Sequence, residues 1–98
     1  MALLHLVNKS PYERDGLDTC VAYCREGDTV LLIEDGVYAA VKAGKAAGKL
    51  SGLDVAVLGS DLAARGIAED KLVDGIKVVD YGGFVDLVEA KDKVQSWL

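Results

Sequence analysis

The segment Thr29–Ala40, TVLLIEDGVYAA, constrains the fold of this chain more than any other stretch. Its continuous apolar run, Val30–Ile33, ends at two acidic residues, Glu34 and Asp35, and Gly36 follows them. A short apolar run bounded by a turn is typical of a buried strand, and the small residues after the turn permit a helix. In α/β folds, sites lie at the carboxyl ends of strands. The segment therefore predicts both an architecture and a place for chemistry.

Strand and helix patterns alternate along the rest of the chain. Strands are predicted over Leu3–Val7, Thr29–Ile33, Asp54–Leu58 and Ile76–Val79, and helices over Gly16–Arg25, Val37–Ala47, Asp61–Arg65 and the segment after Tyr81-Gly82-Gly83. The ending with Val94 and Trp97 is either a short final strand or an interface anchor. Because such βαβ units give parallel sheets with right-handed crossovers, we predict a single α/β domain over residues 1–98. It is a three-layer sandwich around a mostly parallel sheet of four or five strands.

Composition excludes several classes of protein. The 98 residues are 51% hydrophobic, which is too apolar for a disordered chain, yet no apolar run reaches the roughly 20 residues that span a bilayer. Acidic residues outnumber basic ones, 16 to 11, and no basic stripe exists, which argues against direct nucleic-acid binding. The N-terminus does not resemble a signal peptide, and two cysteines on one predicted helix cannot staple a secreted fold. We therefore expect a cytoplasmic protein, and the open edges of a small sheet favour an oligomer over a solvated monomer.

Motifs for common cofactors are missing from the sequence. Gly44–Lys49 has three residues between its glycines and no Ser or Thr after the final lysine, so it does not fit a phosphate-binding loop. No G-x-G-x-x-G follows the first strand. His5 is the one histidine and lies in an apolar strand, where a hydrogen-bonded core or interface residue is favoured over a metal ligand. We predict neither a cofactor nor a metal.

The acidic pair Glu34 and Asp35 allows two interpretations. The two carboxylates could do acid–base work or bind a cation at the strand end. Alternatively, Asp35-Gly36 is a turn, and an acid there favours the start of the next helix. Because no partner His, Lys or third carboxylate can be identified, the structural interpretation is favoured.

Cys20 and Cys24 are the strongest nucleophiles of the chain. Side chains one turn apart on an intact helix do not readily meet disulfide geometry, and both could be small core hydrophobes. Cys20 lies within about one turn of the predicted helix start, where the helix dipole favours a thiolate, whereas Cys24 lies near the end, where the dipole opposes it. Cys20 is therefore the candidate catalytic residue, with the alternative that it is simply buried.

Four groups of residues share a family-like order and spacing. They are Leu4-His5 followed by Asn8-Lys9-Ser10-Pro11, Glu26-Gly27-Asp28 leading into Leu31–Val37, Asp61-Leu62 followed by Ala64-Arg65-Gly66, and Asp80-Tyr81 followed by Phe84-Val85. Together they resemble the DsrH/TusB family, small subunits of sulfur-relay complexes, over nearly the whole chain. The resemblance implies a DsrE/F/H-like fold and a heterohexamer with DsrE- and DsrF-like subunits (TusD- and TusC-like in the tRNA branch).

The resemblance also implies a chemistry. Such complexes pass sulfur as cysteine persulfide to a DsrC/TusE-like carrier, in dissimilatory sulfur oxidation or in 2-thiolation of the tRNA wobble uridine. The DsrE/TusD-type subunit carries its sulfur-accepting cysteine after the third strand, and the matching stretch here, Leu58–Asp61, has none. DsrH-type chains instead have a cysteine in helix one, which Cys20 matches and which TusB-type chains generally lack. Cys24 matches no family position.

The match at Cys20 and the ending Val94–Leu98 favour the sulfur-oxidation branch, closer to DsrH. In this interpretation a Cys20 thiolate accepts sulfane sulfur and hands it on by exchange chemistry. One alternative is a TusB-like subunit of the relay for tRNA thiolation. Another is a non-catalytic assembly subunit or a homo-oligomer.

Overall fold

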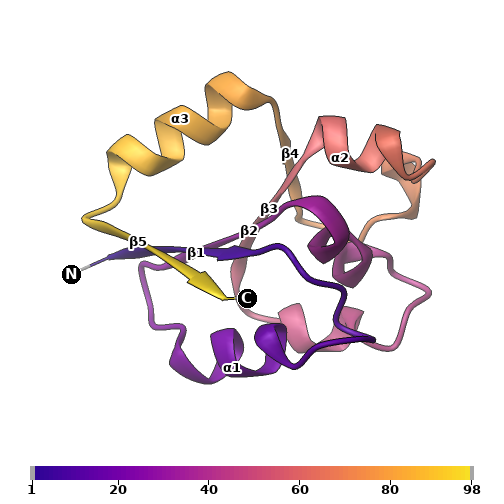
Figure 1. Ribbon diagram of the computed structural model, residues 1–98, viewed down its shortest axis with the longest axis horizontal. Coiled ribbons are helices and arrows are strands. Elements are labelled where there is room, and N and C mark those ends of the chain that lie inside the picture. The colour runs from indigo at the N-terminus through magenta and orange to yellow at the C-terminus, as the bar shows by residue number, and fades with distance from the viewer. Residues whose placement is uncertain (1, 98) are drawn as a thin grey trace.

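Five parallel strands form one sheet in the order β4-β3-β2-β1-β5 (Figure 1). The computed structural model describes residues 2–97, and its strands are β1 (Leu3–Val7), β2 (Thr29–Leu32), β3 (Asp54–Leu58), β4 (Lys77–Val79) and β5 (Lys93–Trp97). The predicted parallel α/β sheet is confirmed. Of the two options for the ending, the final strand is found, although Leu98 lies outside the described residues.

Helices lie on both sides of this sheet. Figure 1 shows α1 (Gly16–Tyr23) below the strands and α3 (Tyr81–Ala90) above them. The remaining helical segments are α2 (Gly59–Ala64) and three 3₁₀ helices, η1 (Glu34–Ala40), η2 (Ala47–Leu50) and η3 (Glu69–Lys71). Within residues 2–97, no helix has the length and apolar character needed to cross a membrane.

The predicted helix over Val37–Ala47 is wrong. The 3₁₀ helix η1 ends at Ala40, and the next residues pair with the segment before β4 instead of continuing a helix. Lys42 N–H donates to the Lys71 carbonyl (2.9 Å), and Val73 N–H donates to the Ala40 carbonyl (2.8 Å). These long-range bonds satisfy backbone groups that a helix would have paired locally, so tertiary contacts override the local preference.

The first helix is also shorter than predicted. It ends at Tyr23 rather than Arg25, because Cys24 adopts an extended backbone (φ −70°, ψ 133°). The Arg25 N–H then donates to Asp28 Oδ2 at 3.1 Å, outside the helix. The residues from Cys24 to Asp28 therefore form a turn, with Gly27 at φ +91°, that carries the chain into β2.

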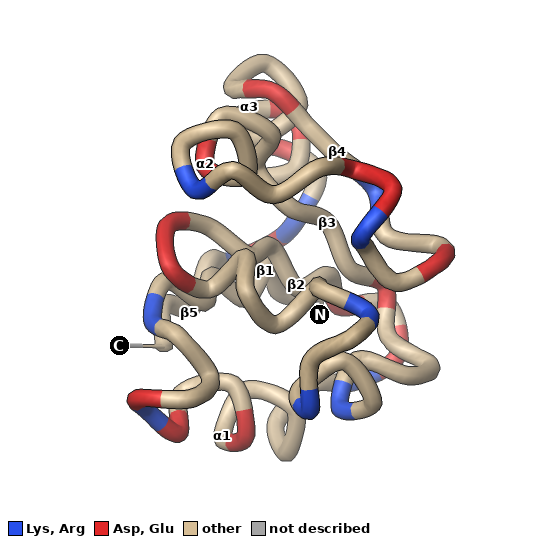
Figure 2. Tube along the Cα trace, turned by 90° about the vertical axis from the view of Figure 1, so that its right-hand side faces the viewer, with Lys and Arg blue, Asp and Glu red and all other residues tan. Residues whose placement is uncertain are grey.

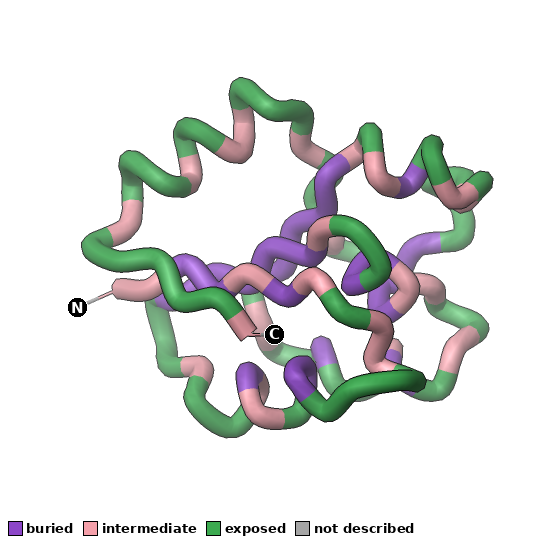
Figure 3. Tube along the Cα trace, in the orientation of Figure 1, coloured by how far each residue is buried: buried purple, intermediate pink, exposed green. Residues whose placement is uncertain are grey.

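The two faces of the sheet are unequally covered. The α1 face holds the larger core, in which Val30, Leu32 and Val57 of the sheet pack with Leu17 and Cys20 of α1. The α3 face buries a smaller cluster, Leu4, Leu31 and Ala56, under the partly exposed Phe84 and Leu87 of α3. Figure 3 shows that buried residues are concentrated in the central strands, whereas the residues of α3 are largely exposed. Figure 2 shows Lys and Arg scattered among acidic residues rather than gathered in a stripe.

Candidate functional site

The acidic pair after β2 is held by contacts from other elements. Glu34 has a left-handed backbone (φ 50°), and its N–H donates to Asp61 Oδ2 at 2.7 Å. Asp35 accepts a hydrogen bond from Arg65 Nε at 2.9 Å, and Arg65 Nη1 lies 3.8 Å from Asp61 Oδ1. These partners could not be identified from the sequence, because Asp61 and Arg65 lie about 30 residues away along the chain.

These contacts support a structural role for the acidic pair. The Arg65 guanidinium pairs with two carboxylates, and the Glu34–Asp61 bond fixes a backbone conformation that non-glycine residues rarely adopt. Gly36 follows at a point where the chain crosses the end of β1, so closely that a Cβ atom would lie 2.1 Å from the Val7 carbonyl oxygen. The segment Glu34–Gly36 therefore lets the chain pass close to the end of β1, and Asp61 and Arg65 hold it there.

Cys20, the candidate catalytic residue, lies in the core on the inner side of α1. Its side chain is fully buried and belongs to the larger core cluster. Burial, followed by the nearby Cys24 and Asp28 groups, raises the pKa of the Cys20 thiol to about 12. In the chain by itself, desolvation of the charged form therefore outweighs the stabilisation of the thiolate that the helix dipole was expected to give. A role of Cys20 in accepting sulfur stays a prediction.

Cys24 is the more accessible of the two thiols. It follows the last residue of α1, is half-buried, and forms no disulfide with Cys20. Burial is the largest effect that raises the pKa of its thiol, and the negative charges of Asp28 and Asp54 add to it. Cys24 has no role that the sequence could predict, because periodicity places it at a helix end and does not reveal which groups face it.

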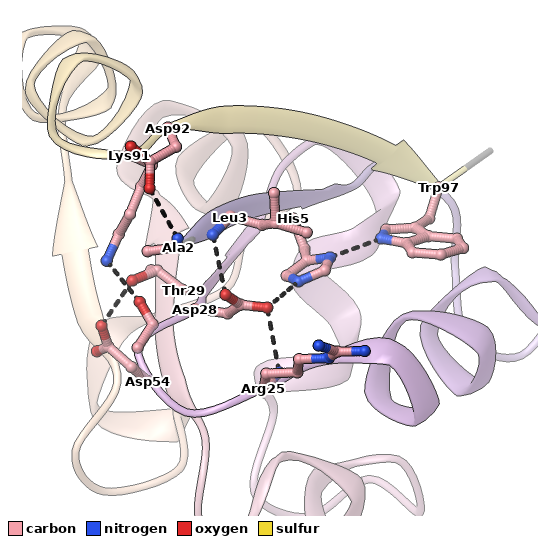
Figure 4. A network of polar contacts seen from close by, with 11 residues as sticks. Ala2, Leu3, His5, Arg25, Asp28, Thr29, Asp54, Lys91, Asp92 and Trp97 are labelled. Carbon is pink, nitrogen blue, oxygen red and sulfur yellow. Dashed lines mark hydrogen bonds and ion pairs between the residues drawn. The ribbon is translucent and has the colours of Figure 1, made fainter.

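A chain of hydrogen bonds joins β1, the end of β5 and the residue before β2 (Figure 4). Cys24 lies close to two of its members, His5 and Asp28. His5 is the third residue of β1 and points to the α1 face, as Val7 does two residues on. Its Nε2 lies 2.8 Å from Asp28 Oδ2, and its Nδ1 lies 3.0 Å from Trp97 Nε1 at the end of β5. Because an indole N–H can only donate, His5 Nδ1 accepts and Nε2 carries the proton that is donated to Asp28. The expectation of a hydrogen-bonded core histidine is confirmed.

Asp28 organises the start of β2. Besides the His5 proton, its carboxylate accepts the Leu3 N–H on Oδ1 (2.9 Å) and the Arg25 N–H on Oδ2 (3.1 Å). Burial by itself would raise the pKa of Asp28, but the hydrogen bonds from His5, Leu3 and Arg25 lower it to about 2. In the sequence, Asp28 stands out only as a member of the Glu26-Gly27-Asp28 group that carries the family resemblance. A lone histidine in an apolar strand, which needs a buried partner, is the signal that could have pointed to it.

The chain resembles known proteins in both sequence and fold. Residues 9–94 match the family described as "DsrH like protein". The chain belongs to the DsrH-like family. It is 35% identical to the protein named TusB from Pectobacterium parmentieri, over 97% of this chain and 100% of that protein. It is 32% identical to TusB from Escherichia coli (strain K12 / DH10B) over the same shares.

Solved structures support the fold. The E. coli ychN protein aligns with a TM-score of 0.79 and 18% identity over 98% of each chain. MTH1491 from Methanobacterium thermoautotrophicum, titled a protein of unknown function, aligns with a TM-score of 0.73 and 17% identity over 96% of each chain. The predicted DsrH/TusB family and DsrE/F/H-like fold are therefore confirmed. The stretch Leu58–Asp61 joins β3 to α2 and contains no cysteine.

Proposed function

We propose that this chain is a TusB-like subunit of a cytoplasmic sulfur relay that serves 2-thiolation of tRNA. The observation that carries the proposal is the match to TusB proteins along their entire length. Cys20 and the ending Val94–Leu98 favoured the sulfur-oxidation branch, but the relatives carry the name of the tRNA branch and fit the alternative better. Its partners in this proposal are TusC- and TusD-like subunits, and the complex delivers persulfide sulfur to a TusE-like carrier.

Within that relay, the chain supports assembly rather than sulfur chemistry. The junction of β3 and α2 lacks the cysteine that the resemblance places in the sulfur-accepting subunit. The thiol of Cys20 is buried and protonated at neutral pH. Exposed apolar side chains on α3, Tyr81, Val85 and Val88, supply surface that a neighbouring subunit can cover.

Two experiments test the proposal, one genetic and one biochemical. Deleting the gene should abolish 2-thiouridine in the tRNA of the source organism, as measured by nucleoside mass spectrometry, and the wild-type gene should restore it. Cys20→Ala should restore it equally well, because a scaffold needs no thiol. Native mass spectrometry of the chain with its TusC- and TusD-like partners should show a hetero-oligomer. Normal thiolation without the gene, or a homo-oligomer that ignores both partners, would contradict the proposal.

The family position of Cys20 favours a second candidate, the DsrH-type role in sulfur oxidation. In that case Cys20 accepts a sulfane sulfur in the assembled complex. Treatment with a persulfide donor should then add about 32 Da, the mass of one sulfur atom, to the wild-type chain. The Cys20→Ser variant should not gain this mass, and an equal gain on that variant would exclude Cys20 as the acceptor.

A further inference from the structure

Three potential metal ligands converge where β1, the end of α1 and the start of β2 meet. They are His5 of β1 and the residues at the two ends of the turn between α1 and β2, Cys24 and Asp28, and their nitrogen, sulfur and oxygen atoms all lie within 4.8 Å of one another. His5 and Asp28 are buried and held in place by hydrogen bonds, while Cys24 is half-buried. The cluster is therefore not a chance grouping of mobile surface acids.

We propose that His5, Cys24 and Asp28 form a binding site for a thiophilic divalent cation, with Zn²⁺ as the best match. Zn²⁺ takes imidazole, thiolate and carboxylate ligands, usually four in a tetrahedron. Softer thiolate donors disfavour Mg²⁺ and Ca²⁺, which prefer sites made wholly of oxygen. Three protein ligands leave a fourth position for water.

The surroundings of the cluster suit a cation. A cleft on one side is lined by Cys24, Asp28, Asp54 and the backbone around Gly27, so an ion can reach the thiol from solvent. The Asp28 carboxylate supplies one full negative charge at the bottom of this cleft, and a Cys24 thiolate would supply a second. Together the two charges balance a divalent ion. Three cationic residues lie near this region. Arg25 contacts Asp28 through its backbone, Lys77 pairs with Asp54, and Lys91 Nζ donates to the Gly27 carbonyl at 2.9 Å.

Binding requires a defined rearrangement of protons. The Cys24 Sγ–H proton leaves to solvent as the Zn–S bond forms, and the Asp28 carboxylate is already ionised. The His5 proton must move from Nε2, where the cation binds, to Nδ1, by exchange with solvent. One proton is released per cation and no electron is transferred.

The same proton shift acts on the C-terminal strand. A proton on His5 Nδ1 would face the Trp97 N–H, donor against donor, across a present separation of 3.0 Å. The cation therefore releases Trp97 from His5, together with its stacking on Tyr23, whose ring centroid lies 5.5 Å away. Because Trp97 is the one tryptophan of the chain, its fluorescence reports this event directly.

The test is a Zn²⁺ titration of the full chain, monitored by tryptophan fluorescence and by proton release into weak buffer. We expect saturation at one Zn²⁺ per chain, a change in Trp97 emission, about one proton released, and no response to Mg²⁺. The matched pair Cys24→Ala and Cys20→Ala separates the two thiols. Cys24→Ala should weaken binding by at least about tenfold, since even supporting residues of metal sites cost that much, and Cys20→Ala should bind as the wild type does.

Three results would overturn the proposal. They are the absence of stoichiometric Zn²⁺ binding, unchanged affinity in Cys24→Ala, and binding that leaves Trp97 emission unaltered, which would exclude His5 as a ligand. Circular dichroism of each variant confirms that it is folded, and Cys24→Ser gives a second, more polar replacement at the half-buried position. Thiolation of tRNA is not a readout here, so failure of this test leaves the proposed relay function to its own experiment.

Discussion

Replacing Gly36 with alanine tests whether the crossing of η1 over β1 is as tight as the structure shows. The new Cβ would lie 2.1 Å from the Val7 carbonyl oxygen and 2.8 Å from the Val7 carbonyl carbon. Optimal contacts between non-bonded carbon atoms are about 3.5–4.0 Å, so the two segments must separate by roughly 1 Å or more. Gly36 does not have a positive φ, so the backbone itself tolerates alanine and steric overlap is the main cost.

The cost follows from what that separation breaks. Overpacking a core position costs typically about 1–3 kcal/mol. The Val7 oxygen also accepts the Ile33 N–H at 3.0 Å, and loss of that bond adds about 1 kcal/mol. We therefore expect Gly36→Ala to lower the free energy of unfolding by about 2–4 kcal/mol. At about 4–8 °C per kcal/mol for a chain of this size, the Tm should fall by roughly 8–32 °C.

Urea unfolding followed by circular dichroism measures this loss, with Gly48→Ala as the matched control. Gly48 is exposed in η2, and a Cβ there would meet nothing within 4 Å. Alanine at position 48 should leave stability unchanged or raise it by up to about 1 kcal/mol, because it restricts the unfolded chain. If Gly36→Ala unfolds within about 0.5 kcal/mol of the wild type, the close approach of η1 to β1 does not exist in solution.

Three further outcomes follow from the buried groups. Trp97→Phe removes the N–H donor to His5 and should lower the free energy of unfolding by about 1 kcal/mol. The backbone amides of β5 should then exchange hydrogen faster. Unchanged exchange would show that this bond does not hold the strand. At pH 8, iodoacetamide should modify Cys24 well before Cys20, because Cys20 is buried and its pKa is raised to about 12. Mass spectrometry of peptides measures the order of modification, and the reverse order would contradict the burial of Cys20. Since the unfolded thiol ionises near its ordinary pKa of 9.0 and the folded one does not, the stability that Cys20 contributes is complete below pH 9 and is lost as pH rises toward 12. The unfolding free energy of the wild type should therefore fall more steeply above pH 9 than that of Cys20→Ala, and parallel curves would refute the raised pKa.

Much of the architecture could be predicted from local patterns. The four strands of the sequence analysis all occur within about one residue of their predicted bounds, because short apolar runs between turn residues have few other ways to bury themselves. The predicted helix over Val37–Ala47 was wrong for the opposite reason. Its small apolar residues fit a helix, but long-range backbone bonds to Lys71 and Val73 decide their conformation.

The sequence by itself determined the parallel α/β fold, the family, and the segments where chemistry was worth seeking. These features could be predicted because hydrophobic periodicity and turn residues depend only on neighbours a few positions away. The family resemblance likewise rests on the order of residues along the chain. Only the tertiary structure decided which groups meet. His5 contacts Asp28 across 23 residues and Trp97 across 92, and Arg65 reaches Asp35 across 30. It also decided that Cys20 faces the core while Cys24 joins His5 and Asp28, since burial and charge depend on packing that no local pattern contains.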